Sequence, residues 1–254
     1  MKTLALGLNT FREAIRDKVL YSLFFFAVVM IGISMILDHL TIGERTKIIK
    51  DFGLASILLF GVLIAVFVGI GLVYKEIEKK TIYNILSKPI HRYQFILGKY
   101  LGLVMVLFSE VALMSIVFLA MLYFYEGTVD CYLFYAIGTT FIELMVITAF
   151  ALLFSSFSTP ILSGLFTLSF YIIGHLTSDL LELGQKGYSR FFECIATALY
   201  YLIPNLEFFN LKGDVVYHKP ISAEYLFFAC SYGLLYILLL LLISIVVFQT
   251  RDLK

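Results

Sequence analysis

The 254-residue sequence has no tryptophan, only four prolines and only three cysteines, and charged residues make up just 15% of it. Soluble domains carry about a quarter charged residues, so this composition argues against a soluble protein. The formal net charge of +1 gives no reason to expect a nucleic-acid partner. Cys131, Cys194 and Cys230 have no CxxC spacing, so the sequence predicts neither a zinc site nor a disulfide framework. We expect free thiols unless the loops of Cys131 and Cys194 meet outside the cell.

Several motifs of catalysis and nucleotide binding are missing from the sequence. It has no GxSxG, no HExxH and no tryptophan-rich haem-handling motif. It also has no GxxxxGK[ST], because Tyr93 stands where the first glycine would precede Gly98–Lys99, and Tyr100 replaces the serine or threonine. The polypeptide therefore cannot bind ATP through a P-loop of its own.

Long apolar runs dominate what remains. Hydrophobic residues make up 61% of the chain and the mean hydropathy is +0.96. A bilayer requires about 20 apolar residues for each helix that crosses it. The sequence predicts an all-α polytopic membrane protein with six spans, at residues 19–37, 52–74, 96–122, 132–156, 161–182 and 224–249. The polar run SSFSTP (155–160) predicts a tight turn between spans four and five; one kinked helix is the alternative.

Basic residues predict the orientation of the bundle. With both termini in the cytoplasm, the inner segments hold 12 lysines and arginines and the outer segments hold seven, and all are assigned outside the spans. Positive charge favours the cytoplasmic side, so both termini are expected inside. Lys2, Arg12, Arg16 and Lys18 precede an apolar run too long for a signal peptide, which indicates an uncleaved first anchor.

Two further helices are expected outside the spans. Leu4, Leu8, Phe11 and Ile15 recur at helical spacing within residues 1–18, which predicts an amphipathic helix in the cytoplasmic interface. A cytosolic extension of span one is the alternative. In the extracytoplasmic segment 184–223, the apolar run 191–204 is too short to cross, so it predicts a re-entrant or interfacial helix that ends at Pro204.

The largest cluster of positive charge lies between spans two and three, at residues 75–95. Residues 75–87 have the pattern of a short amphipathic helix, and Pro89 predicts that this helix ends near Lys88. A second helix is expected to begin near Arg92 and to continue into span three. The pattern fits a shaped cytoplasmic elbow, although an ordinary positively charged loop is an equal alternative.

The elbow carries a family resemblance. Its strings E-x-E-K-x-T, I-L-S-x-P-I-x-R and I-L-G-K-x-L-G resemble the cytoplasmic segment of type-2 ATP-binding-cassette exporter permeases, the ABC-2 family. The matching residues are Glu76, Glu78, Lys79, Thr81, Ile85, Leu86, Ser87, Pro89, Ile90, Arg92, Ile96, Leu97, Gly98, Lys99, Leu101 and Gly102. Lys80 departs from the pattern, because the family commonly has glycine there. Six spans, the N-terminal helix and the LIPNLEFFN stretch (202–210) also resemble the family.

The resemblance implies a function for the elbow. In such permeases this loop is a coupling helix that rests in a groove of a separate ATPase subunit. The ATPase-coupling residues would be Glu76, Glu78, Lys79, Thr81, Ile85, Leu86, Ser87, Pro89, Arg92, Gly98 and Lys99. No cofactor is expected in this chain, since the partner ATPase, present in two copies, would bind ATP and Mg²⁺. A second permease copy or a paralogue would complete the pathway, in the lipid of a bacterial or archaeal cytoplasmic membrane.

Two acids fall within the predicted spans. Glu110 and Glu143 each lie about a dozen residues into spans three and four, which places both near the middle of the bilayer at a rise of ~1.5 Å per residue. The short turn 126–131 makes these spans antiparallel neighbours, so the acids could meet. Intramembrane acids are costly, and we hypothesise that these two line the translocation path or share a proton. Alternatively, each is protonated and bonds a hydroxyl of a neighbouring helix.

His175 and Asp179 stand four residues apart near the outer end of span five. The spacing could supply two metal ligands, but no third ligand is near in sequence, so a hydrogen-bonded pair is expected and no metal site.

The leading hypothesis is the membrane subunit of an ATP-driven exporter. A polytopic membrane enzyme that uses the two intramembrane glutamates as acid and base is one alternative. A membrane scaffold that transports nothing is the other. The sequence does not select a substrate.

Overall fold

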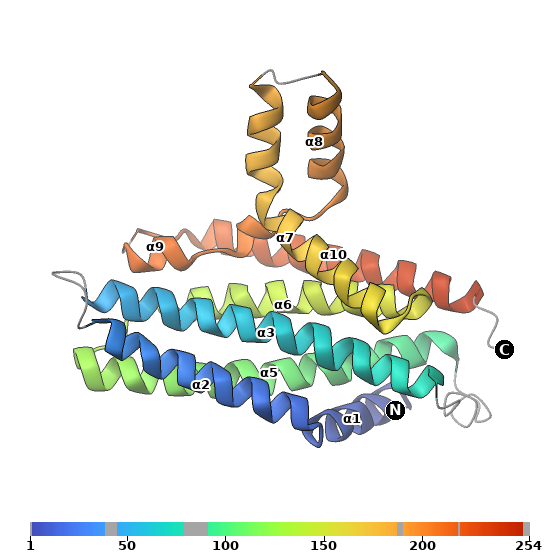
Figure 1. The fold of residues 1–254 in the computed structure, drawn as a ribbon, viewed down its shortest axis with the longest axis horizontal. Helices are drawn as coiled ribbons and strands as arrows, with labels where there is room; N and C mark the ends of the chain where they lie inside the picture. The colour runs from blue at the N-terminus through green and yellow to red at the C-terminus, as the bar shows by residue number, and fades with distance from the viewer. Residues whose placement is uncertain (1, 39–44, 79–90, 187–189, 218, 251–254) are drawn as a thin grey trace.

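The computed structural model describes residues 2–38, 45–78, 91–186, 190–217 and 219–250. Within these ranges the chain is helical and contains no strand, which confirms the all-α prediction. Figure 1 shows the long helices running side by side along the longest axis of the molecule. The six that correspond to the predicted spans are α2 (Lys18–Asp38), α3 (Arg45–Glu78), α5 (Arg92–Glu126), α6 (Tyr132–Phe157), α7 (Pro160–Gln185) and α10 (Ala223–Thr250).

Five of these helices are long and apolar enough to cross a membrane, namely α3, α5, α6, α7 and α10. The first predicted span is different. Among the residues whose side chains are described, α2 contributes Lys18–Ser34, and this stretch forms a candidate span together with α1 (Lys2–Ile15), which it meets at a bend of 65°. The described residues therefore contain five candidate spans, or six if this bent pair counts as one.

The helix ends follow the local sequence. Gly127 closes α5 with φ of 72°, a left-handed conformation that glycine adopts without steric cost, and its N–H donates to the carbonyl of Tyr123. Ser158 is extended after α6, and Pro160 is the first residue of α7, where its missing N–H costs no hydrogen bond. The predicted turn between spans four and five is thereby confirmed, and the single kinked helix is excluded.

Helix ends that are predicted to lie on the same side of the membrane lie at the same end of the bundle. Figure 1 shows the start of α1, the end of α3, the start of α5 and the end of α10 together at one end. The opposite end holds the start of α3, the end of α5 and α9 (Lys212–Val216). This arrangement agrees with a chain whose first and last helices begin and end on the same side of the membrane.

Helix α3 lies at the centre of the apolar core. Its buried side chains, including Leu54, Ile57 and Ile64, pack together with residues of α5 and α6. Two glycines of α3 allow close approach, because a Cβ on Gly53 would collide with the Phe118 ring and one on Gly61 with the Leu144 side chain. Small residues at helix contacts are the usual means of tight packing in membranes.

The N-terminal helix α1 is formed as expected but buries a different face. Leu4 and Leu8 of the predicted apolar stripe are 63% and 40% exposed, whereas Gly7, Thr10 and Ala14 are buried. This small-residue face packs along α5. The bend after α1 rules out a straight extension of span one, and Leu4 and Leu8 face outward. The interfacial position of α1 stays a prediction.

The predicted short helix before Pro204 is present as α8 (Arg190–Leu202). Figure 1 shows that α7 bends, so that its second half leaves the bundle and runs antiparallel to α8. The 3₁₀ helix η1 (Leu206–Phe209) and α9 then lead the chain back to the bundle. Cys131, Cys194 and Cys230 are free, as expected.

Two sequence predictions are wrong at the level of helix bounds. Residues 75–78 continue α3 instead of beginning a separate amphipathic helix, because no breaker precedes them, and residues 79–90 lie outside the described part of the chain. The long helices also contain basic residues that were assigned to loops. Lys50 of α3 is buried with its Nζ 3.6 Å from Glu126 Oε2, and Lys99 of α5 is 1% exposed.

Candidate functional site

The most polar part of the buried core is centred on Glu143 of α6. Its side chain is 1% exposed, and its Oε1 lies 2.8 Å from Nε2 of His175 on α7. Helix α6 positions Glu143 within a long apolar sequence, where an isolated carboxylate would be very costly. The histidine satisfies that carboxyl group.

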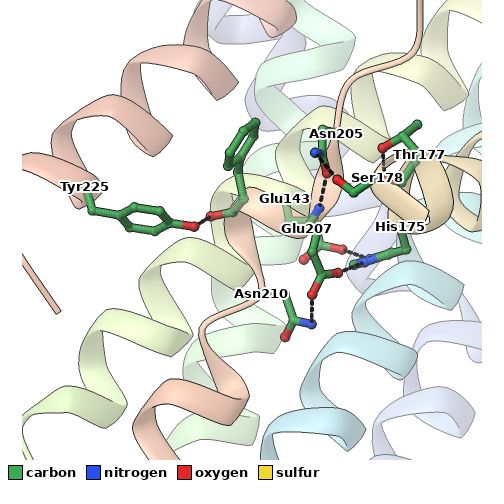
Figure 2. A network of polar contacts seen from close by, with 10 residues as sticks. Glu143, His175, Thr177, Ser178, Asn205, Glu207, Asn210 and Tyr225 are labelled. Carbon is green, nitrogen blue, oxygen red and sulfur yellow. Dashed lines mark hydrogen bonds and ion pairs between the residues drawn. The ribbon is translucent and has the colours of Figure 1, made fainter. Parts of the chain in front are cut away.

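His175 contacts a second carboxyl group on its other ring nitrogen. Nδ1 lies 3.2 Å from Oε2 of Glu207 in η1, and the imidazole and Tyr171 rings pack edge to face at a centroid distance of 4.9 Å. Figure 2 shows both contacts of His175, one to Glu143 and one to Glu207. The three residues Glu143, His175 and Glu207, which we call the triad, join two long helices to the segment that follows α8.

A set of hydrogen bonds fixes the η1 end of the triad. Asn205 caps η1, because its Oδ1 accepts from the Glu207 N–H at 3.0 Å, and its Nδ2 donates to the Ser178 hydroxyl at 2.8 Å. Asn210 Nδ2 donates to Glu207 Oε1 at 2.8 Å. The backbone N–H of Asn205 donates to the Tyr232 hydroxyl of α10 at 2.9 Å. Glu207 is therefore held in place even though half of its side chain is exposed.

Packing reinforces these bonds at Gly174, the residue before His175. A Cβ at this position would lie 2.8 Å from the side chain of Leu206 and 3.1 Å from the Pro204 carbonyl. Glycine thus allows the Pro204 backbone and the Leu206 side chain of η1 to lie directly on α7. Leu206 is itself buried, so its side chain forms part of the packed contact between η1 and α7.

Lys212 of α9 is a further cation that interacts with both acids of the triad. Burial lowers the pKa of Lys212, and the negative charges of Glu143, Glu207 and Asp51 act against that lowering. The site thus contains two basic groups, Lys212 and His175, among three acids. Within the described ranges, no group of three His, Cys, Asp or Glu side chains has the geometry to hold a metal ion.

The structure corrects the prediction for His175 and Asp179. Asp179 is exposed, and His175 finds its partners on α6 and η1 instead of one turn away on its own helix. Both ring nitrogens of His175 have carboxyl partners on other elements, so neither is left for Asp179.

Glu110 and Glu143, the two predicted translocation-path acids, have different environments. No hydrogen bond joins them in the described part of the chain, because Glu143 is bonded to His175. Glu110 is 5% exposed, and its Oε2 has no hydrogen-bond partner among the described residues. The Ser115 hydroxyl on the same helix is likewise buried and unpartnered there. Of these two buried acids, Glu110 is the one with a carboxyl oxygen that lacks a hydrogen-bond partner among the described residues.

Most predicted ATPase-coupling residues cannot be placed. Lys79, Thr81, Ile85, Leu86, Ser87 and Pro89 lie outside the described residues. Glu76 and Glu78 belong to the last turn of α3, but their side chains are not described. Arg92, Gly98 and Lys99 are described, and α5 begins at Arg92 as the sequence predicts.

Arg92 ties the start of α5 to the end of α10. Its Nη1 donates to the Gln249 carbonyl at 2.8 Å and to the Phe248 carbonyl at 3.2 Å. Carbonyls in the last turn of a helix have no partner within the helix, so a cation there caps it. The Phe95 and Phe248 rings stack at 5.4 Å with an interplanar angle of 15° and form a second contact between the same helices.

Gly98 and Gly102 form the surface on which α1 rests. A Cβ at Gly98 would lie 2.7 Å from Leu6 Cβ, and one at Gly102 would lie 2.7 Å from the Gly7 carbonyl. The G-x-x-x-G spacing places both glycines on one face of α5, as in close helix pairs in membranes. Lys99 lies between them in sequence, with its Nζ 5.9 Å from the centre of the Phe95 ring. The start of α5 is therefore packed against both α1 and the end of α10.

Sequence reasoning missed Glu207, Asn205 and Lys212 as members of the site. A signal was present, since Asn205 and Glu207 are polar residues within the apolar stretch LIPNLEFFN. Their distance of about thirty residues from His175 gave no indication of contact.

Comparison with known protein sequences identifies the family of the chain. A search of curated protein sequences finds no significant match. The sequence profile of a family described as "ABC-2 family transporter protein" matches residues 4–253. That range includes every described helix except the first two residues of α1. The chain belongs to the ABC-2 family of transporter proteins.

Proposed function

We propose that the chain is the membrane-spanning permease subunit of an ATP-binding-cassette exporter in a bacterial or archaeal cytoplasmic membrane. The observation that carries the proposal is the family match over residues 4–253 of a chain whose long helices are apolar enough to cross a membrane. Clustering of the first and last helix ends at one end of the bundle supports a topology with both termini in the cytoplasm (Figure 1). The excess of basic residues at that end supports the same orientation.

Energy for transport would come from a separate chain. The sequence has no P-loop motif, and ABC-2 permeases generally work with an ABC ATPase, so ATP and Mg²⁺ belong to that partner. Two ATPase copies and a second permease, identical or paralogous, would complete the complex. Exposed apolar side chains on α7 and α8, including Leu176, Leu183 and Phe191, supply surface for a second copy or for lipid.

The connection between α3 and α5 is the proposed docking element for the ATPase. Glu76 and Glu78 end α3, and the basic cluster follows at residues 79–92. Movement of this connection would reach α10 through Arg92 and α1 through Gly98 and Gly102, since these contacts join the three helices. Rigid-body motion of packed helices is a recognised means of coupling two distant sites.

Co-purification tests the proposal. The tagged chain, extracted from its native host in mild detergent, is expected to retain a polypeptide that contains a P-loop and hydrolyses ATP. Charge reversal at Glu76 and Glu78 should release that polypeptide, because the acids flank the docking element. Matched reversal at Glu193 and Glu224, which are exposed acids away from it, should not. A chain that purifies without any ATPase would contradict the proposal and favour a scaffold.

A further inference from the structure

In the triad, each ring nitrogen of His175 contacts a carboxyl group of another residue. Nε2 lies 2.8 Å from Glu143 Oε1 and Nδ1 lies 3.2 Å from Glu207 Oε2. A neutral imidazole has one N–H donor and one lone pair, whereas an ionised carboxylate has only acceptors. If all three groups were in those forms, one of the two contacts would place two lone pairs against each other.

Both contacts are satisfied only when the triad holds one additional proton. The proton can reside on His175, which then donates from both nitrogens to two carboxylates. It can equally reside on one acid, which then donates to the lone pair of a neutral His175. The two arrangements have the same composition and differ only in which atom carries the proton.

We propose that Glu143, His175 and Glu207 form a proton-binding site, and that the bound proton latches the η1–α9 segment (residues 203–217) to helices α6 and α7. Glu143 and His175 are contributed by the two helices and Glu207 by η1, so deprotonation breaks a hydrogen bond that joins this segment to the bundle. The released proton passes to water, since half of the Glu207 side chain is exposed.

Neighbouring groups set how tightly the proton is held. Lys212 of α9 interacts with both acids of the triad, and Asp51 of α3 interacts with Lys212 in turn. From α7 itself, Tyr171 presents its ring to His175, while Asp179 is exposed. Asn210 donates to Glu207, and Tyr232 of α10 bonds the Asn205 backbone. A positive Lys212 stabilises the ionised acids and so opposes proton binding.

Release of the proton should move Glu207 away from His175. Loss of one hydrogen bond beside a carboxylate that is 1% exposed leaves a buried polar group without its partner. Such a group is costly, so the exposed acid, Glu207, is the one that moves away and His175 turns its remaining N–H to Glu143. The latch therefore holds at low pH and releases as the pH rises.

Hydrogen exchange of residues 203–217 measures the latch in the full-length chain in lipid nanodiscs. After correction for the intrinsic pH dependence of exchange, wild-type protection is expected to fall by up to about tenfold per pH unit, as for release of one proton. Peptides from α5, which carries no part of the triad, should show no such change. The measurement needs no ATPase, so its failure would not bear on the proposed function.

Substitution of either acid by glutamine distinguishes the effect of the bound proton from the effect of the hydrogen bonds. In Glu207→Gln the side-chain amide donates to the lone pair of neutral His175, whose N–H then donates to Glu143, so both contacts form without the additional proton. Protection of residues 203–217 should then vary by less than about twofold across the same pH range, since no proton is released. In Glu143→Gln the amide donates to His175 Nε2 in the same way, and protection should again vary little with pH. His175→Phe should lose protection at every pH, and Asp179→Asn should behave as wild type.

Two results would overturn the proposal. One is corrected wild-type protection that does not change with pH. The other is a pH dependence in both glutamine variants as steep as that of the wild type, which would locate the titrating group elsewhere. Glu207 is half exposed, so its variant is expected to fold even if Glu143→Gln does not.

Discussion

Arg92 and Gln249 are joined across 157 positions of the chain by a 2.8 Å hydrogen bond from the guanidinium to the backbone carbonyl. The bond fixes the first residue of α5 against the last turn of α10, next to the connection proposed to contact the ATPase. Arg92 is thus the described residue best placed to transmit movement of that connection into the bundle.

Substitution of Arg92 should uncouple the two helices. Arg92→Ala is expected to lower ATP hydrolysis by the assembled complex roughly fivefold, within the range that coupling residues contribute. Arg92→Lys should lose less, because a lysine can still donate to one carbonyl but lacks the planar fork. ATP hydrolysis unchanged in Arg92→Ala would show that the α5–α10 contact does not transmit the movement.

The contact between α1 and α5 should be intolerant of any added carbon. In Gly102→Ala the new Cβ would lie 2.5 Å from Thr10 Cβ, so the variant should lose about 1–3 kcal/mol of stability, as overpacked cores do. Gly138→Ala is the matched control, since a Cβ there meets nothing within 4 Å. Thermal denaturation in detergent compares the two, and equal melting temperatures would contradict tight packing of α1.

Removal of the histidine should destabilise the chain through Glu143. His175→Phe leaves a buried carboxyl group without its hydrogen-bond partner, which costs about 1–3 kcal/mol. The double variant Glu143→Leu/His175→Phe should recover much of this loss, because no buried polar group then remains unpaired. A melting temperature as low in the double variant as in His175→Phe would argue against this hydrogen bond as the cause.

Lys212 should set the pH at which residues 203–217 lose protection. Burial lowers its pKa, and while charged it favours the ionised forms of Glu143 and Glu207. Lys212→Gln removes that positive charge, so the triad should retain its proton to a pH higher by roughly half to one unit. Hydrogen exchange of the segment gives the midpoint directly. A midpoint that moves to lower pH would contradict the assigned electrostatics.

Glu110 should have opposite effects on stability and activity. Its Oε2 is buried without a hydrogen-bond partner among the described residues, so Glu110→Met is expected to keep or raise the melting temperature. If the acid serves the translocation path, ATP hydrolysis by the complex should fall in the same variant and in Glu110→Gln. Wild-type activity in both variants would leave Glu110 without a role in transport.

The positions of the long helices could be predicted from the sequence because each is an uninterrupted apolar run. Bounds were less predictable, as α3 shows: the charged residues 75–78 can continue a helix, and no proline or glycine stops it there. The turn that ends in Pro160 was predicted correctly, since proline has a specific backbone requirement. Gly127 lies in the predicted turn 126–131, but α5 continues to Glu126, beyond the predicted end of span three at residue 122.

The triad could not be predicted because its members are far apart in sequence. Glu143 and Glu207 lie on opposite sides of His175 in the chain, 32 residues away in each direction. The buried face of α1 was missed for a different reason. Hydrophobic periodicity selects Leu4 and Leu8, but in a membrane the large apolar side chains can face lipid while Gly7 and Thr10 pack against protein.

ATP hydrolysis by the purified complex in lipid nanodiscs tests the central claim most directly. This chain alone should not hydrolyse ATP, since it has no P-loop, and the co-purified ATPase should be several-fold faster with the chain than without it. Charge reversal at Glu76 and Glu78 should remove that difference, whereas reversal at Glu193 and Glu224 should leave it. An ATPase whose rate is the same with and without this chain would contradict the account.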